Sequence, residues 1–334
     1  MGQGRRSVPA ALGRRRRQAT VKTALVTTCY REAEAIDAFL DAVAAQTRQP
    51  DGVVIVDAGS EDGTVERVQA RIDGGARLRL IVEPGANRSV GRNRAVEESG
   101  AELLAVTDVG SEPRPDWFER IIGPLESDAT VDVVAGYYAP HPRTTWEAAV
   151  AAATVPTVEE VDPATFLPSG RSVAFRRKAW EQVGGYPAWA WHNEDTPFDL
   201  ALKAAGARFV FEPKAVVEWR PQARIGRLFV QFYRYARGDA QGRIWFRHYT
   251  KAYALLALKL GLLVGGAFWW PLWLGLLLLG AAYWARHALR ARRRTASTAA
   301  AWLAPLANGI VDSAHVFGYT RGLLERRGHG PRDR

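Results

Sequence analysis

Residues 53–64 read Val-Val-Ile-Val-Asp-Ala-Gly-Ser-Glu-Asp-Gly-Thr, and this stretch decides the fold class. An unbroken run of four β-branched residues predicts a short strand that is buried on both faces of a sheet. The glycines that follow permit a tight turn, and Asp57 stands at the tip of the strand. A carboxylate in that position can accept hydrogen bonds from the amide or hydroxyl groups of a ligand. Taken alone, the segment fits a plain strand-to-helix turn equally well.

The chain on either side repeats this alternation of apolar strand and helix between residues 23 and 107. Strands are expected over residues 24–29, 53–56, 78–82 and 103–107, and helices over residues 36–44, 63–72 and 90–99. Continuous apolar strands separated by helices predict an α/β fold with a mainly parallel sheet covered on both faces. Such sheets bind ligands at the carboxyl ends of their strands, where Glu32, Asp57 and Asp108 stand in this sequence.

A second group of motifs lies in residues 166–221. Phe166-Leu167-Pro168-Ser169-Gly170-Arg171-Ser172 comes first, followed by Gly184-Gly185-Tyr186 and by the acidic pair Glu194-Asp195. An isolated acidic pair is ordinarily solvated surface charge. Group transfer to a hydroxyl, however, needs a carboxylate that takes the hydroxyl proton. The pair is therefore a candidate for the catalytic site.

In these motifs the chain resembles the family 2 glycosyltransferases, over residues 22–235. The family's Asp-x-Gly-Ser-x-Asp-Gly-Thr element is similar to residues 57–64, its Arg-Asn pair to Arg92-Asn93, and its Glu-Asp pair to Glu194-Asp195. The resemblance implies the glycosyltransferase A fold, which is a Rossmann-like α/β domain. It also implies transfer of a sugar, with inversion, from a nucleoside-diphosphate sugar.

The resemblance implies a set of residues that bind this donor: Glu32, Asp57, Arg92, Asp108, Gln231 and Arg234. Glu32 and Asp57 would hold the ribose and the base, and Arg92 would lie near the base or the phosphates. The last two belong to a segment that resembles the family's Gln-x-x-Arg-Trp element, with Tyr235 in place of the tryptophan. A helix at a membrane interface, whose arginines meet lipid headgroups, fits that segment equally well.

The acceptor side is implied in the same way. Asp195 would be the catalytic base that takes the proton of the acceptor hydroxyl, and Glu194 would orient the acceptor. Gly170 and Arg171 would bind the acceptor beside them.

The implied cofactor is a divalent cation, Mg²⁺ or Mn²⁺, bound with the donor diphosphate at Asp108. The family usually has Asp-x-Asp at this place, whereas this chain has Asp108-Val109-Gly110. Mg²⁺ is commonly held by one or two carboxylates together with phosphate oxygens and water, so one carboxylate is compatible with a metal. Ser111 or Glu112 could supply a further ligand. Gly110 leaves strict metal dependence open.

Residues 252–285 are almost wholly apolar. As a single helix they would be about 50 Å long, too long for a hydrocarbon core of about 30 Å. A break at Pro271 gives a hairpin, and a hairpin keeps the basic residues that follow it, from Arg286 onward, on the cytoplasmic side with the rest of the chain. A hairpin buried inside a soluble domain is the alternative.

Four segments follow from these patterns. They are a disordered basic arm (1–21), a catalytic domain (22–245), a membrane hairpin (246–290) and an amphipathic, basic C-terminal segment (291–334). The protein is accordingly expected at the cell membrane, with its catalytic domain in the cytoplasm.

The net charge of +10 is concentrated at the two ends of the 334-residue chain. Residues 1–23 and residues 286–334 carry +7 each, which leaves −4 for residues 24–285. A mildly acidic central domain argues against nucleic acid as a partner. The single cysteine, Cys29, excludes an intrachain disulfide.

The favoured hypothesis is an inverting glycosyltransferase with a part in cell-envelope biogenesis. Its partners would be a nucleoside-diphosphate sugar, a lipid-linked or envelope glycan acceptor, and the membrane. A non-catalytic membrane scaffold that retains the nucleotide-sugar-binding fold is the alternative, prompted by Gly110.

Overall fold

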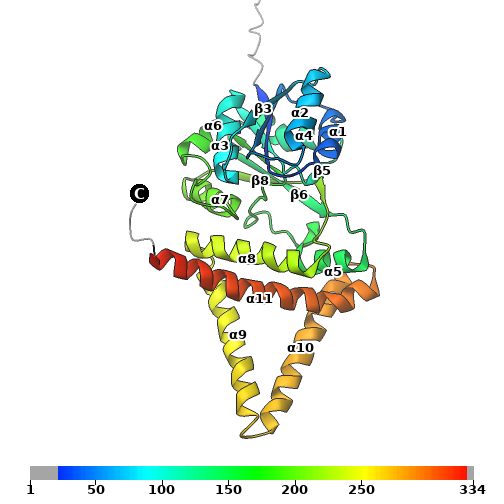
Figure 1. The fold of residues 1–334 in the computed structure, drawn as a ribbon, viewed down its shortest axis with the longest axis vertical. Helices are drawn as coiled ribbons and strands as arrows, with labels where there is room; N and C mark the ends of the chain where they lie inside the picture. The colour runs from blue at the N-terminus through cyan, green and yellow to red at the C-terminus, as the bar shows by residue number, and fades with distance from the viewer. Residues whose placement is uncertain (1–21, 329–334) are drawn as a thin grey trace, which may run out of the picture.

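The computed structural model describes residues 22–328 and arranges them in three tiers (Figure 1). An α/β domain forms the first tier, and two long helices that lie across its lower side form the second. A pair of helices that leaves this layer on the far side forms the third. The expected basic arm, residues 1–21, lies outside the described residues.

The described strands form one sheet in the order β3-β2-β1-β4-β7-β6-β8-β5. Their bounds are β1 (Thr23–Cys29), β2 (Gly52–Asp57), β3 (Leu78–Val82), β4 (Leu103–Val106), β5 (Ser111–Pro113), β6 (Val133–Pro140), β7 (Val173–Arg176) and β8 (Phe209–Trp219). The first four strands in chain order are mutually parallel, β6 and β8 run in the same direction, and β7 and β5 run against them. The predicted α/β fold with a mainly parallel sheet is confirmed, and the predicted strand over residues 78–82 has the bounds expected.

Both faces of the sheet are covered, as the apolar runs predict. On β2, Val53 and Ile55 point into one core and Val54 and Val56 into the other, and all four are buried. The first core is closed by α1 (Ile36–Ala44), α2 (Thr64–Asp73) and α4 (Trp117–Ser127). The second is closed by α3 (Arg88–Ser99), α6 (Arg177–Gln182) and α7 (Asp195–Ala204).

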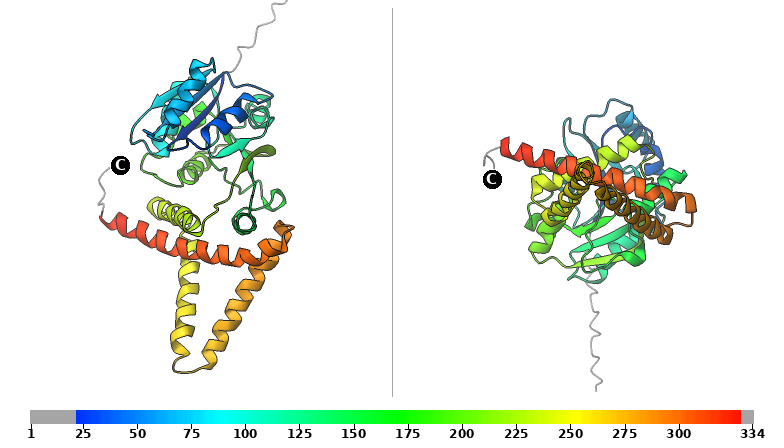
Figure 2. Two further views of the ribbon diagram at one scale, coloured as in Figure 1. Left: turned by 45° about the vertical axis from the view of Figure 1, so that its right-hand side comes forward. Right: turned by 90° about the horizontal axis from the view of Figure 1, so that it is seen from below.

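The middle tier consists of α8 (Ile225–Gly242) and α11 (Thr298–Gly328), which lie side by side, with α5 (Thr145–Thr154) packed on α11 (Figure 2). Glycine makes the close approach possible, since a Cβ at Gly318 would overlap the carbonyl oxygen of Tyr233 on α8. Along α11, a stripe of alanines is buried while Trp302 and Phe317 are 60% and 63% exposed. The layer is therefore packed on one side and apolar on the other.

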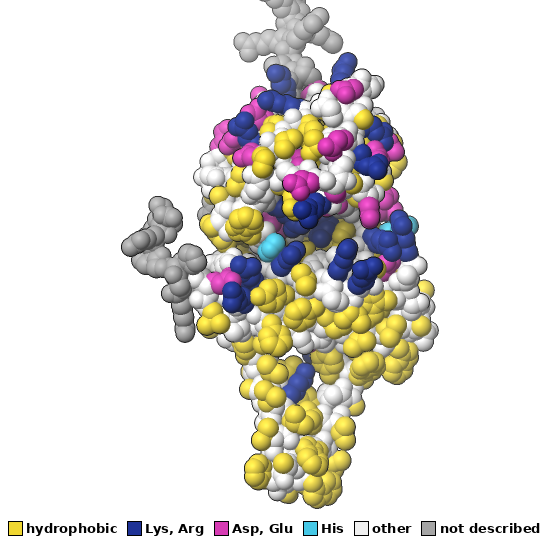
Figure 3. Space-filling model, viewed as in Figure 1, with side chains coloured by type: hydrophobic (Ala, Val, Ile, Leu, Met, Phe, Trp, Pro, Cys, Tyr) yellow, Lys and Arg dark blue, Asp and Glu magenta, His cyan; other side chains and the backbone are white. Residues whose placement is uncertain are grey.

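The third tier is a hairpin of α9 (Phe246–Gly265) and α10 (Pro271–Arg294), which converge on a short turn at residues 266–270 (Figures 1 and 2). Its apolar side chains are uncovered: Phe268 is 89% exposed, Leu277 68% and Leu278 71%. Figure 3 shows hydrophobic surface over the hairpin and Lys and Arg side chains gathered above it. Within residues 22–328, α10 alone is long and apolar enough to cross a membrane by length and composition. A hairpin buried within a soluble domain does not fit this exposure.

Candidate active site

A cleft of about 1060 Å³ opens where the carboxyl ends of β1, β2 and β4 face α8. Of the residues expected at the site, those that line it are Glu32, Asp108, Arg171, Gln231 and Arg234. The edge of the sheet therefore forms one side of the cleft, and α8 of the middle tier forms the other. This explains why residues from two distant parts of the sequence meet in one cavity.

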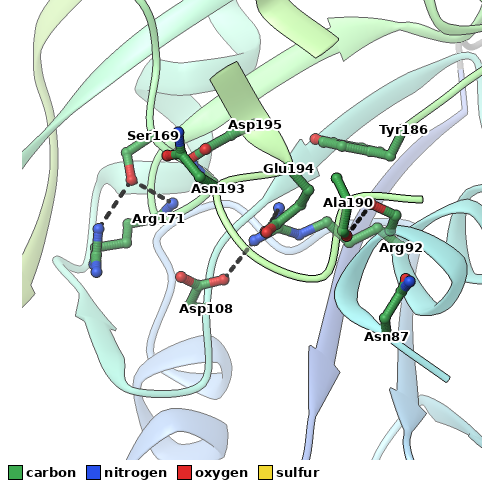
Figure 4. A network of polar contacts seen from close by, with 12 residues as sticks. Asn87, Arg92, Asp108, Ser169, Arg171, Tyr186, Ala190, Asn193, Glu194 and Asp195 are labelled. Atoms are coloured by element: carbon green, nitrogen blue, oxygen red, sulfur yellow. Dashed lines mark hydrogen bonds and ion pairs between the residues drawn. The ribbon is translucent and has the colours of Figure 1, made fainter. Parts of the chain in front are cut away.

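A buried arginine joins the two acidic motifs behind the wall of this cleft (Figure 4). Arg92, on α3, is 1% exposed; it donates to Asp108 Oδ1 at 2.7 Å and to Glu194 Oε1 at 2.6 Å. Gly170 lies directly against its guanidinium, where a Cβ would overlap the nitrogens. The donors of Arg92 are directed at the two carboxylates and Arg92 does not line the cleft, so the expected position near the base or phosphates holds only through its neighbour Asp108.

The two carboxylates that share Arg92 respond differently to it. Burial acts to raise the pKa of Asp108, but the guanidinium groups of Arg92, Arg88 and Arg171 outweigh it and hold this pKa below its usual value. At Glu194, which is 3% exposed, burial prevails over Arg92 and raises the pKa. Glu194 therefore binds Arg92 in the protein interior. The sequence predicts that Glu194 orients the acceptor, but its side chain is buried and does not line the cleft.

Asp195 is the first residue of α7 and remains half-buried. Its Oδ2 accepts a hydrogen bond from the Gly170 amide at 3.1 Å, and its Oδ1 accepts one from the Thr196 amide at 2.9 Å. These bonds fix the carboxylate beside the segment that carries Arg171, so the predicted catalytic and acceptor residues are brought together.

Asp57 supports the turn after β2, which is the alternative that the sequence left open for this segment. Its carboxylate is completely buried and accepts hydrogen bonds from the Gly59 amide at 2.9 Å, the Ser60 amide at 2.6 Å and the Cys29 thiol at 3.3 Å. It therefore holds the turn after β2 and does not line the cleft, in contrast to the expected contact with the base or ribose.

Glu32, which does line the cleft, has its pKa raised by burial and then by Asp108.

Arg171 forms a polar and aromatic wall with residues of β8, β6 and α8. Its guanidinium lies 4.8 Å from the ring centre of Trp219 and 5.3 Å from that of Tyr138. Its Nη2 donates to the Tyr235 hydroxyl at 3.4 Å, and Gln231 donates to the same hydroxyl at 3.0 Å. Stacked and hydrogen-bonded in this way, Arg171 is preorganised to meet an anion or a sugar.

Sequence reasoning missed several residues of the cleft: Tyr30, Arg88, Trp191, His192 and Trp219. Arg88 lies before the helix predicted over residues 90–99, and only the structure places it in the first turn of α3, where a positive charge opposes the helix dipole. Such a position is unfavourable unless an anion is bound nearby. Burial, then Arg234 and Arg88, lowers the pKa of His192 to about 4, so this imidazole is neutral at pH 7.

A divalent cation fits this site through a single carboxylate. The described residues contain no group of three or more His, Cys, Asp or Glu that could hold a metal ion. Asp108, 31% exposed at its side chain, lines the cleft together with Ser111, whose buried hydroxyl has no hydrogen-bond partner among the described residues. Glu112 is exposed on β5 and is not part of the lining. One carboxylate and one hydroxyl, completed by phosphate oxygens and water, satisfy the preferences of Mg²⁺.

Comparison with known proteins gives consistent results. The family model described as "Glycosyl transferase family 2" matches residues 24–184, and that described as "Glycosyl transferase family group 2" matches residues 113–305. The succinoglycan biosynthesis protein ExoA of Rhizobium meliloti (strain 1021) is 28% identical over 259 residues, which are 73% of this chain and 76% of that protein. Glycosyltransferase AglE of Haloferax volcanii is 28% identical over 248 residues, 71% of this chain and 78% of that protein.

Among solved structures, the mannosyltransferase PcManGT of Pyrobaculum calidifontis, in complex with GDP-Man and Mn2+, superposes with a TM-score of 0.56. It is 21% identical, and the match covers 92% of this chain and 87% of that one. At this identity the likeness concerns the fold, and it confirms the glycosyltransferase A architecture expected from the sequence.

Proposed function

Because the chain belongs to the family 2 glycosyltransferases, we propose that it moves a sugar, with inversion, from a nucleoside-diphosphate sugar to a hydroxyl of a lipid-linked or cell-envelope glycan. The observation that carries the proposal is the bridge made by Arg92 between Asp108 and Glu194. It couples the carboxylate at the diphosphate end of the cleft to the residue that precedes the base. The carboxylate proposed to bind the donor diphosphate and the residue next to the proposed base are thereby both fixed to one arginine side chain.

The residues divide the reaction between them. Asp195 takes the proton of the acceptor hydroxyl, whose oxygen attacks the anomeric carbon from the side opposite the diphosphate. The bond between that carbon and the diphosphate oxygen breaks, and the nucleoside diphosphate leaves with the electron pair. Arg88 and Arg234 line the cleft and stabilise the charge that develops on the diphosphate, while Arg171 binds the acceptor. A divalent cation, Mg²⁺ or Mn²⁺, held at Asp108 and Ser111 would supply further electrophilic stabilisation of that charge.

The hairpin and the helix layer support a location at the membrane. Residues 246–290 would insert their exposed apolar side chains into the lipid, while the arginines of α8 and those in the last turns of α10 remain at the cytoplasmic surface. In this arrangement the catalytic domain, residues 22–245, faces the cytoplasm, and the segment from residue 291 onward lies along the surface. Because α8 forms one wall of the cleft, an acceptor anchored in the lipid would enter the cleft along this helix.

A membrane scaffold that binds sugar nucleotides without transferring them is the competing function, favoured by Gly110 in the place of a second aspartate. The test uses the full-length protein in detergent and a panel of UDP-, GDP- and dTDP-sugars with Mg²⁺ or Mn²⁺. One donor is expected to raise the melting temperature and to be turned over. Asp195→Asn should abolish turnover while keeping the thermal shift, and Asp73→Asn on exposed α2 should behave like the parent. Binding with turnover that survives Asp195→Asn would contradict the mechanism, and binding without any turnover would support the scaffold.

A further inference from the structure

A buried carboxylate of α8 connects the hairpin to the segment that carries the catalytic pair. Asp239 is 6% exposed. Its Oδ1 accepts a hydrogen bond from the Asn193 side-chain amide at 2.5 Å, and its Oδ2 accepts one from the Tyr249 hydroxyl at 2.5 Å. Burial raises the pKa of Asp239 to about 6, so the group is ionised at neutral pH and both bonds are charge-assisted.

On one side, the bond to Asn193 fixes the backbone directly before Glu194 and Asp195. Asn193 has a left-handed φ of 59°, a conformation that asparagine adopts more readily than most residues. Its side-chain oxygen accepts a hydrogen bond from the Thr196 hydroxyl at 3.3 Å. Gly238, next to Asp239, lies so close to the loop that a Cβ would overlap the carbonyl oxygen of His192. The loop is therefore pressed against α8 and tied to it by one carboxylate. In Figure 4, Asn193 and Asp195 lie side by side.

On the other side, the bond to Tyr249 reaches the base of the hairpin. Tyr249 lies in the first turn of α9, is 3% exposed, and stacks on Tyr319 of α11 with ring centres 3.9 Å apart. Any change in how α9 sits against the helix layer must displace this ring and its hydroxyl. Asp239 is the group that would transmit such a displacement to Asn193.

We infer that Asp239 is a positioning residue, which sets the geometry of Asp195 through Asn193 and makes sugar transfer depend on the seating of the hairpin through Tyr249. The inference rests on the proposed function, in which Asp195 is the base. Asp239 itself is not among the residues that line the cleft. Its loss should therefore reduce the rate of transfer and leave donor binding intact.

The experiment compares two tyrosine–aspartate bonds of the same kind in the full-length protein. Asp239→Asn removes the negative charge that strengthens both hydrogen bonds, and Tyr249→Phe removes the hydrogen bond to α9; both changes nearly preserve side-chain volume. Asp312→Asn and Tyr283→Phe make the same two changes at the matched bond between α11 and α10, which spans 2.8 Å and lies away from the loop. Release of nucleoside diphosphate is measured with the sugar nucleotide that gives the largest thermal shift.

Both variants at Asp239 and Tyr249 should lower kcat by about tenfold or more, with the donor KM within about twofold of the parent. The double variant should be no slower than the slower single variant, since both changes break one network. The Asp312 and Tyr283 variants should retain the parent kcat. Equal kcat in the two pairs, or a donor KM that rises in step with the loss of rate, would overturn the inference.

Two safeguards keep the outcomes separable. Tyr249→Phe retains the stacked ring, so it tests the link even where Asp239→Asn does not fold. Asp195→Asn is measured in parallel. Full activity in that variant means that the proposed function fails, whereas inactivity there with parental kcat in the Asp239 and Tyr249 variants means that only this inference fails.

Discussion

The strands of the sheet and the helices of the hairpin are alike in sequence, since both are runs of aliphatic residues, but they differ in what covers them. Ile55 of β2 is 0% exposed beneath its helices, whereas Leu277 and Leu278 of α10 are 68% and 71% exposed. Apolar surface removed from water contributes about 25 cal/mol per Å² in either region. The chain supplies the cover for the sheet, and within the described residues it supplies none for these leucines. These side chains therefore need an apolar environment that residues 22–328 do not supply.

Charged groups show the opposite distribution. The sheet region encloses Arg92 and Glu194, whose side chains are 2% and 4% exposed, at the edge where the cleft lies. Burying charges is costly, and a folded domain retains them where they are paired or where the chemistry requires them. Asp239 stands where the two regions meet and is bonded to both. The cleft therefore lies between a region whose apolar side chains are covered by the chain itself and a region whose apolar side chains are exposed.

The largest effect is expected when charged residues replace exposed apolar side chains of the hairpin. Leu277→Arg combined with Leu278→Arg should weaken association with phosphatidylglycerol-containing vesicles by about 6 kcal/mol, because each arginine within a membrane costs about 3 kcal/mol. The melting temperature of the protein in detergent should remain that of the parent. Flotation of the vesicles measures the first quantity and scanning fluorimetry the second.

The matched control for this double change is Val82→Arg on β3, where the parent side chain is 48% exposed on the sheet region. It should leave both flotation and melting unaltered. If the double variant floats as well as the parent, the hairpin is not what holds the protein at the membrane.

The next effect concerns the buried charges. Arg92→Met leaves Glu194 and Asp108 without their shared partner, and removing one member of a buried ion pair costs about 4 kcal/mol of unfolding free energy. The comparison is Arg48→Met, whose partner Glu126 is 34% exposed at its side chain, with an expected loss of no more than about 1 kcal/mol. Urea unfolding followed by tryptophan fluorescence measures both. Equal losses of unfolding free energy at the two arginines would mean that burial does not increase the contribution of the ion pair to stability.

The same contrast explains how much the sequence could predict. The pattern of apolar residues along the chain reflects which side chains are buried in each local element. This pattern alone predicts a strand over residues 78–82, with the bounds that β3 has in the structure. The motifs likewise led to Asp108, Arg171 and Gln231, which the structure brings into one cleft.

What the sequence could not predict is the direction and reach of long side chains. Arg92 is part of a motif, but whether its guanidinium enters the cleft or turns behind it depends on the neighbouring Gly170 and on two distant carboxylates. Asp57 is also part of a motif, but its carboxylate accepts hydrogen bonds from the amides of the turn that follows it and does not reach the cleft. Asp239 and Tyr249 carried no motif at all, because their link to Asn193 exists only once three separate segments are packed together.

A third effect follows from the pKa of Asp239, which burial raises to about 6. Between the ordinary pKa of an aspartate, about 4, and this value, the folded protein binds a proton that the unfolded chain releases, so stability falls as the pH rises through that window. The total change is about 3 kcal/mol, and above pH 6 it is complete. Asp239→Asn cannot titrate, so the parent should gain stability relative to this variant when the pH is lowered from 7 to 4.5. Parallel stability curves for the two proteins would show that Asp239 does not titrate as stated.

The smallest effect tests the packing that holds the two regions together. At Gly318 of α11 an added Cβ would overlap the Tyr233 carbonyl oxygen of α8, whereas at Gly309 of the same helix nothing lies within 4 Å. Gly318→Ala should therefore force the helices apart and lower the unfolding free energy by about 2 kcal/mol. Gly309→Ala should raise it by about 0.5–1 kcal/mol, because alanine is the better helix former and meets no neighbour. Opposite signs from the same substitution on one helix, measured by thermal unfolding in detergent, identify contact with α8 as the cause. Two changes of the same sign would mean that helix propensity, and not this contact, governs the stability of the layer.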